Sequence, residues 1–232
     1  CPSNNQVLKV METTTSISNP INLIFLIALM GLVPFFLTLA TSYIKIIVVT
    51  YLIRNALGIQ QVPPGMVLSG LAMILSIFVM APVGVKTYDL LQQQDVSTVE
   101  TSPYNVLEIA DNVSGPLKDF LQHNTDERIL NAFTNTAQRI WPQEIHNVIS
   151  KDSLIFIIPS FVISELTKAF QIGFLLYLPF IAIDLIISNI LLAMGMMMVS
   201  PMTISLPFKL ILFVTLDGWL KLSQGLLYSY SY

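Results

Sequence analysis

The feature that most constrains this chain is a nearly uncharged run over residues 169–208, in which Asp184 is the single charged residue. A transmembrane helix needs about 20 predominantly apolar residues, so this run is long enough to enter a bilayer and turn back. Gly195 and Pro201 stand at the expected turn, where glycine ends one helix and proline begins the next. The run therefore predicts a helical hairpin whose irregular turn lies inside protein or lines a cavity.

Three adjacent methionines, Met196, Met197 and Met198, occupy this predicted turn. Methionine is unbranched and its thioether is soft, so a group of three can repack against itself or against a changing partner. Two interpretations are open: the methionines fill gaps in a protein core, or they form a deformable seal. The residue types alone favour neither.

The composition excludes an ordinary soluble domain. Of the 232 residues 54% are hydrophobic and 11% are charged, whereas about a quarter of the residues in a soluble domain are charged. The net charge of −3 provides no basic surface for nucleic acid. We therefore expect an all-α integral membrane protein that binds no nucleic acid and contacts membrane lipid.

The first part of the chain predicts a helical hairpin. A polar segment, residues 1–20, precedes an apolar block at 21–53 and an uncharged block at 66–85. The first block is too long for one straight crossing, so we expect tilt or a break at Pro34. Gly58, Pro63 and Pro64 lie between the blocks and predict the turn. The first hairpin thus covers residues 21–86.

Residues 87–152 differ in character, with ten acidic and four basic residues and both histidines. Helical periodicity over 106–120 and 128–141 predicts a small α-helical domain inserted between the hairpins. Its net charge of −6 favours a non-cytoplasmic location, although orientation follows Lys and Arg rather than net charge. Residues 153–232 form the second hairpin, so the architecture is two helical hairpins, four hydrophobic helical blocks and one insertion.

Charged residues within or beside the apolar blocks are Lys45, Glu165, Lys168, Asp184, Lys209, Asp217 and Lys221. Glu165 with Lys168, and Asp217 with Lys221, have the spacing of pairs on one helix face. At ~1.5 Å per residue, Asp184 and Lys209 differ in depth by roughly 7 Å when counted from the tip. A pair across the hairpin or between subunits is therefore expected.

Lys45 lies deep in the first block, which predicts a buried pairing site or a wet surface, with a snorkelling lysine near a helix end as the alternative. The aromatic residues near the end of the chain, Trp219, Tyr228, Tyr230 and Tyr232, suit an interfacial belt.

Enzyme chemistry is not favoured. His123 and His146 fall in the polar insertion, away from the apolar blocks, and one cysteine with two distant histidines has no metal-ligand spacing. The glycines form no phosphate loop. We expect no catalytic residue, no metal and no cofactor. A small-solute or ion/proton transporter subunit remains the alternative function, because intramembrane charges and broken helices recur in transporters.

Several stretches together resemble the FliP/SctR family, core export-gate proteins of flagellar and injectisome type III secretion. Residues 54–64 are similar to the family's cytoplasm-side hairpin turn, and residues 159–174 to its central signature, which residues 177–185, 195–198 and 213–219 continue. The resemblance runs from about residue 21 to the last residue and is weakest over 87–152. Residues 81–84, 141–142 and 199–201 favour the Ysc-like injectisome branch over the flagellar one.

The resemblance implies a core subunit of the type III secretion export gate. Family members assemble as a pentamer with small SctS-like and SctT-like subunits, beside an SctU-like switch protein and the inner-membrane rings. Unfolded secretion substrates pass through the centre. A methionine gasket closes the resting pore, and maps here to Met196, Met197 and Met198. The implied location is the bacterial inner membrane, with a periplasmic domain and much of the complex held above the bilayer plane.

Overall fold

The fold is all-α, as the sequence predicts. The computed structural model describes residues 20–59, 61–93, 114–142 and 150–231, and these contain helices and no strand. The helices are α2 (Pro20–Leu39), α3 (Tyr43–Ala56), α4 (Gly65–Gln93), α6 (Gly115–Asn124), α7 (Glu127–Ile140), α9 (Leu154–Ala193), α10 (Pro201–Thr215) and α11 (Gly218–Tyr228). Residues 106–113, where a helix is also expected, lie outside the described part of the chain.

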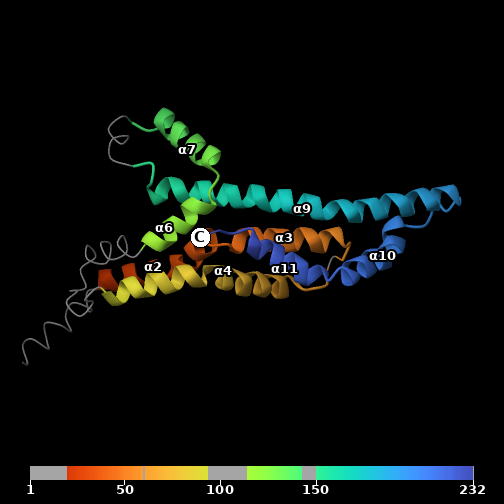
Figure 1. Cartoon of the computed structure of the whole chain (residues 1–232), viewed down its shortest axis with the longest axis horizontal. Helices are drawn as coiled ribbons and strands as arrows, with labels where there is room; N and C mark the ends of the chain where they lie inside the picture. The colour runs from red at the N-terminus through yellow and green to blue at the C-terminus, as the bar shows by residue number, and fades with distance from the viewer. Residues whose placement is uncertain (1–19, 60, 94–113, 143–149, 232) are drawn as a thin grey trace, which may run out of the picture.

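The longest helix, α9, runs along most of the molecule, and α3 and α10 pack against it (Figure 1). The α3–α4 turn and the α9–α10 loop point toward the same end, with the α9–α10 loop projecting further (Figure 1). Helices α6 and α7 lie toward the opposite end (Figure 1). The molecule is therefore long and polarised, with turns at one end and the inserted helices toward the other.

The first apolar block is broken, but not where proline predicts. Helix α2 continues through Pro34 and ends at Leu39, and α3 begins at Tyr43. The hydroxyl of Ser42 in this break donates to Ser76 of α4, so short polar side chains rather than proline mark the interruption. The expected break at Pro34 is wrong, because a helix can continue through a proline when neighbouring groups satisfy the freed backbone.

The turn between α3 and α4 forms as its residues predict. Gly58, with φ of 77°, follows the last turn of α3 in a conformation that residues with a Cβ rarely adopt. The peptide bond before Pro63 is cis. The carbonyl of Pro64 accepts the first backbone hydrogen bonds of α4, from Val67 and Leu68.

The broadest contact in the molecule joins α3 to α9. Small residues of α9 make it possible: Ala169 is fully buried, and a Cβ on Gly173 would overlap the side chain of Leu52. Around this contact Ile46, Val49 and Ile53 of α3 form a core that also contains residues of α9, α10 and α11. Close approach through small residues is a common way for apolar helices to pack.

A second core joins the insertion to the hairpins. Phe120 and Leu121 of α6 are buried together with Ile157 and Phe161 of α9 and with Tyr230. The backbone N–H of Asp126, which precedes α7, donates to the hydroxyl of Ser164 in α9. Helix α4 itself continues to Gln93, beyond the expected start of the insertion. The described helices of the insertion are therefore packed on the membrane-type helices, and its non-cytoplasmic location stays a prediction.

Two helices of the described chain, α4 and α9, are long and apolar enough to cross a membrane, and the pair α10–α11, bent by 60°, would make a third. The four predicted hydrophobic blocks correspond to α2 with α3, to α4, to α9 and to α10 with α11. Within the first block, α3 alone has 14 residues and reaches only about 21 Å of a core about 30 Å thick. Exposed Ile74, Phe78, Phe170 and Phe174 leave broad apolar faces on α4 and α9, which are typical of membrane or subunit contacts.

The α3–α9 contact can be tested at Gly173. Replacing Gly173 with Ala should lower the free energy of unfolding in detergent by about 1–2 kcal/mol, because the added methyl overpacks the contact with Leu52. Gly70→Ala in α4 is the matched control: it gives the same gain in helix propensity with open space around the methyl. Equal thermal unfolding of the two variants would contradict the close α3–α9 packing.

Candidate functional site: the methionine loop and the buried charges

The methionine loop, residues 194–200, is held by backbone hydrogen bonds at the end of α9. Gly195 has φ of 72°, its N–H donates to the carbonyl of Leu192, and the N–H of Met196 donates to Leu191. This is the Schellman arrangement, in which a glycine ends the helix and its last carbonyls are satisfied. Pro201 occupies the first turn of α10. Both residues that predict the turn therefore form it.

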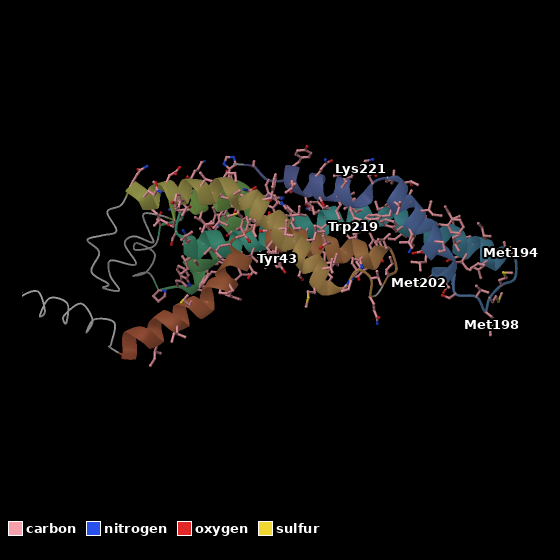
Figure 2. All side chains as sticks on the ribbon, turned by 90° about the horizontal axis from the view of Figure 1, so that it is seen from below. Tyr43, Met194, Met198, Met202, Trp219 and Lys221 are labelled. Carbon is pink, nitrogen blue, oxygen red and sulfur yellow. The ribbon has the colours of Figure 1, made fainter. Side chains whose placement is uncertain are left out.

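The three methionines do not fill a core within this chain. The exposed fractions of Met196, Met197 and Met198 are 48%, 81% and 99%. Figure 2 shows Met194, Met198 and Met202 together at the far tip of the molecule, away from Tyr43 in the body. Within the described part of the chain no core encloses these side chains, and an exposed apolar group of this kind is typical of an interaction surface. The role of these residues as a seal stays a prediction.

An ion pair lies between this tip and the body. Lys209 of α10 donates to Oδ2 of Asp184 in α9 over 2.6 Å, and the Lys209 side chain is 3% exposed. The hydroxyl of Ser205 donates to the other carboxylate oxygen of Asp184, also at 2.6 Å. Lys209 further donates to the carbonyl of Ala56 at the end of α3. The pair forms within one hairpin, so the expected pairing of Asp184 with Lys209 is confirmed.

A second cluster of charges lies in the body and is centred on a fully buried pair. Nζ of Lys45 in α3 lies 3.3 Å from Oε1 of Glu165 in α9, and both side chains are 0% exposed. Nζ of Lys168 lies 3.9 Å from the same oxygen, the spacing expected from the sequence. Of the alternatives for Lys45, the buried pairing site is confirmed, and a snorkelling lysine is excluded by its burial. A buried charged group requires such a partner, because the transfer of a charge from water into an apolar interior costs several kcal/mol.

The third expected pair, Asp217 with Lys221, is absent, although both residues are in the described part of the chain. Both side chains are exposed, and only the N–H of Lys221 bonds to the backbone carbonyl of Asp217. The reason is conformational: Asp217 has φ of 51° and lies in the bend before α11 instead of inside a continuous helix. A four-residue spacing joins side chains only on one uninterrupted helix.

The bend is fixed by packing. A Cβ on Gly218 would overlap the ring of Phe213, and the rings of Phe213 and Trp219 meet edge to face with centroids 5.3 Å apart. Figure 2 shows Trp219 and Lys221 on α11, well behind the tip. The turn between α10 and α11 therefore aims α11 back along the body.

Two functional contacts escaped the sequence interpretation. Tyr230, expected in an interfacial belt, is 8% exposed, and its hydroxyl donates to Glu165. Tyr228 is 84% exposed, so the belt prediction is wrong for Tyr230 and stays a prediction for Tyr228. Tyr232 lies outside the described residues. The missed signal was spacing: Leu222, Leu226 and Tyr230 recur every four residues, which indicates one buried helix face. The second missed contact is the hydrogen bond from Ser205 to Asp184. No sequence pattern distinguishes Ser205 from the other small polar residues.

No group of three His, Cys, Asp or Glu side chains that could hold a metal occurs among the described residues. The carboxylates of Glu165 and Asp184 accept hydrogen bonds from lysine, serine or tyrosine donors. The arrangement combines a body in which the buried lysines are paired with carboxylates and a tip with exposed methionine side chains.

Comparison with known proteins identifies the family. A sequence model of the FliP family matches residues 26–226. The chain is 52% identical over 210 residues to Yop proteins translocation protein R of Yersinia pestis, covering 90% of this chain and 96% of that protein. It is 48% identical over 207 residues to virulence protein YscR of Salmonella typhimurium, covering 89% and 95% of the two chains. It is 45% identical over 214 residues to harpin secretion protein HrcR of Erwinia amylovora, covering 91% and 97%. The chain belongs to the FliP family.

Proposed function

We propose that this chain is a core subunit of a type III secretion export gate, which forms with copies of itself the inner-membrane pore for unfolded secreted proteins. The relatives named for Yop translocation, virulence and harpin secretion support a role in secretion of the injectisome type. The all-helical, apolar structure supports a place in the membrane. The chain is not an enzyme in this proposal and uses no cofactor.

The observation that carries the proposal is the exposure of Met196, Met197 and Met198 at the tip of a projecting hairpin. A gate for polypeptides has to exclude ions at rest and yield to side chains of every size. Methionine side chains of several copies, meeting on an axis, would pack to exclude water and move aside with little rotamer strain. Because the loop backbone is fixed by the Schellman motif, this flexibility resides in the side chains.

The partners follow from the same family. We infer a pentamer of this chain with SctS-like and SctT-like subunits, adjoining an SctU-like switch protein and the inner-membrane rings. Support comes from exposed apolar side chains along α4, α9 and α10, such as Met73, Leu185 and Phe208, which one chain leaves uncovered. Subunit contacts or lipid would remove this surface from water.

The orientation is inferred from the polarity of the fold. Both hairpin turns lie at one end and the described helices of the insertion, α6 and α7, lie toward the other (Figure 1). If residues 54–64 form the cytoplasm-side turn, the insertion at 87–152 faces the periplasm. The proposed location is therefore the bacterial inner membrane with a periplasmic insertion.

The competing function, a small-solute or ion/proton transporter, depends on what Asp184 does. Asp184 is fixed between Lys209 and Ser205, which favours a structural role over proton transfer. Asp184→Asn should lower the amount of assembled complex on a blue-native gel, with secretion falling in proportion. Loss of one partner of a buried pair costs about 3–5 kcal/mol, and the partial exposure of Asp184 places it near the lower value.

Asp217→Asn is the matched control for this variant, since Asp217 is an exposed carboxylate on the same hairpin without an ion pair in the described chain. It should assemble and secrete at the wild-type level. Normal assembly of Asp184→Asn combined with abolished transport would instead support proton coupling and the transporter function.

The seal is tested by replacing Met196, Met197 and Met198 together with alanine. The variant should assemble normally, because these side chains are outside the core of the chain, while the closed complex leaks ions. The corresponding leucine variant keeps the apolar volume but is stiffer, so its leak should stay low and its secretion should slow. Ion leak and complex yield are measured on the same membranes. Poor assembly of the alanine variant without leak would identify the methionines as packing residues.

A further inference from the structure

The segment after α11 is bound to three other helices through one buried side chain. The hydroxyl of Tyr230 donates to Oε2 of Glu165 in α9 and lies 3.1 Å from the carbonyl oxygen of Ser42, just before α3. Nζ of Lys45 lies 3.5 Å from the centroid of the Tyr230 ring, and the ring stacks on Phe120 of α6. Tyrosine in an apolar core needs a partner for its hydroxyl, and here that partner is the buried ion pair itself.

The next residue adds a two-point attachment to the insertion. The side-chain amide of Asn124, in α6, donates to the carbonyl of Ser231 over 3.0 Å, and its oxygen accepts from the N–H of Ser231 over 3.3 Å. Asn124 is 3% exposed, and its backbone carbonyl accepts from Lys168. We call these contacts of Tyr230 and Ser231 the tail clasp. They join the end of the second hairpin to α6 and to the Lys45–Glu165 pair.

Between the bend and the tail clasp, α11 borders an apolar groove. The groove is partly open to the surface, has a volume of about 340 Å³ and lies among residues of α3, α9, α10 and α11, including Phe180, Phe213 and Leu226. Leu222 and Leu226 are the buried side chains of α11 in the neighbouring core.

The α10–α11 arm is thus attached at two polar points. The Asp184–Lys209 pair holds α10 near the methionine loop, and the tail clasp holds the far end of α11. Between these points lies the bend at Asp217 and Gly218, whose backbone departs from the helix. An arm attached at both ends and bent in the middle moves as a unit only when one of its two attachments opens.

We propose that the tail clasp is a latch that holds the α10–α11 arm, and with it the methionine loop, in the resting position. This inference rests on the proposed sealing function of the loop. Opening of the latch exposes polar groups of a buried network together, so the transition is between two discrete states and not a gradual loosening. The latch also couples α6 of the insertion to the loop at the opposite end of the molecule.

Two variants weaken the latch in different ways. Tyr230→Phe removes the hydroxyl but keeps the ring against Lys45 and Phe120. Asn124→Ala removes both side-chain hydrogen bonds to the backbone of Ser231. Ser231 is exposed, so its freed backbone groups can bond to water. Tyr228→Phe is the matched control, because it removes a hydroxyl from an exposed ring two residues earlier, at the last residue of α11.

Three quantities are measured on the assembled membrane complex: hydrogen exchange in a peptide covering residues 227–231, complex yield and resting ion leak. Loss of a hydrogen bond to a charged group should speed exchange by about tenfold in Tyr230→Phe. Both latch variants should leak more than Tyr228→Phe at equal complex yield. The leak should be smaller than that of the triple methionine-to-alanine variant, because the seal itself is intact.

Faster exchange without added leak would overturn the latch, since the clasp would then be a local contact only. A lower complex yield without leak would also overturn it and assign Tyr230 and Asn124 to stability. If the triple alanine variant leaks and the latch variants do not, the seal stands and the latch fails. If the triple alanine variant does not leak, the sealing function fails and the latch fails with it.

Discussion

The buried pair of Lys45 and Glu165 is the interaction on which the rest of the structure depends. Neither side chain reaches solvent, and an unpaired charge among apolar helices would cost several kcal/mol. The pair therefore fixes how α3 lies along α9, and the fully buried Ala169 lets the two backbones approach beside it. Tyr230 extends the same network to the segment after α11.

The Asp184–Lys209 pair repeats this arrangement nearer the tip. It joins α9 to α10, and its bond to the Ala56 carbonyl reaches the end of α3. The two pairs divide the molecule into a body where charges neutralise each other and a tip where methionines remain uncovered. Such a division is suitable for a gate, because a rigid frame can present soft side chains at a constant position.

Turns set by local backbone preferences could be predicted from the sequence, whereas contacts between helices far apart in the sequence could not. Helices end or begin at Gly58, Gly195 and Pro201 because of the backbone preferences of these residues, so the predicted turns were confirmed. Asp184 and Lys209 were paired correctly because the hairpin geometry relates their depths. The Lys45–Glu165 pair joins residues 120 positions apart, and no periodicity within one helix indicates a contact between helices so distant in the sequence. The predicted Asp217–Lys221 pair was wrong for a local reason. The two residues have the four-residue spacing of a helical pair, but the helix is interrupted at Asp217 itself.

In the proposed gate, methionine loops of several copies meet when the gate is closed. Cysteine cross-linking in membranes tests it most directly, with Met198→Cys in a Cys1→Ser background and Tyr228→Cys, at another exposed position, as the control. A disulfide requires Cβ atoms about 3.5–4.5 Å apart. We expect rapid oxidative dimers between chains at Met198, no dimers at Tyr228, and slow labelling of Met198→Cys by a membrane-impermeant maleimide. Rapid labelling of Met198→Cys in the assembled complex without cross-linked chains would contradict it.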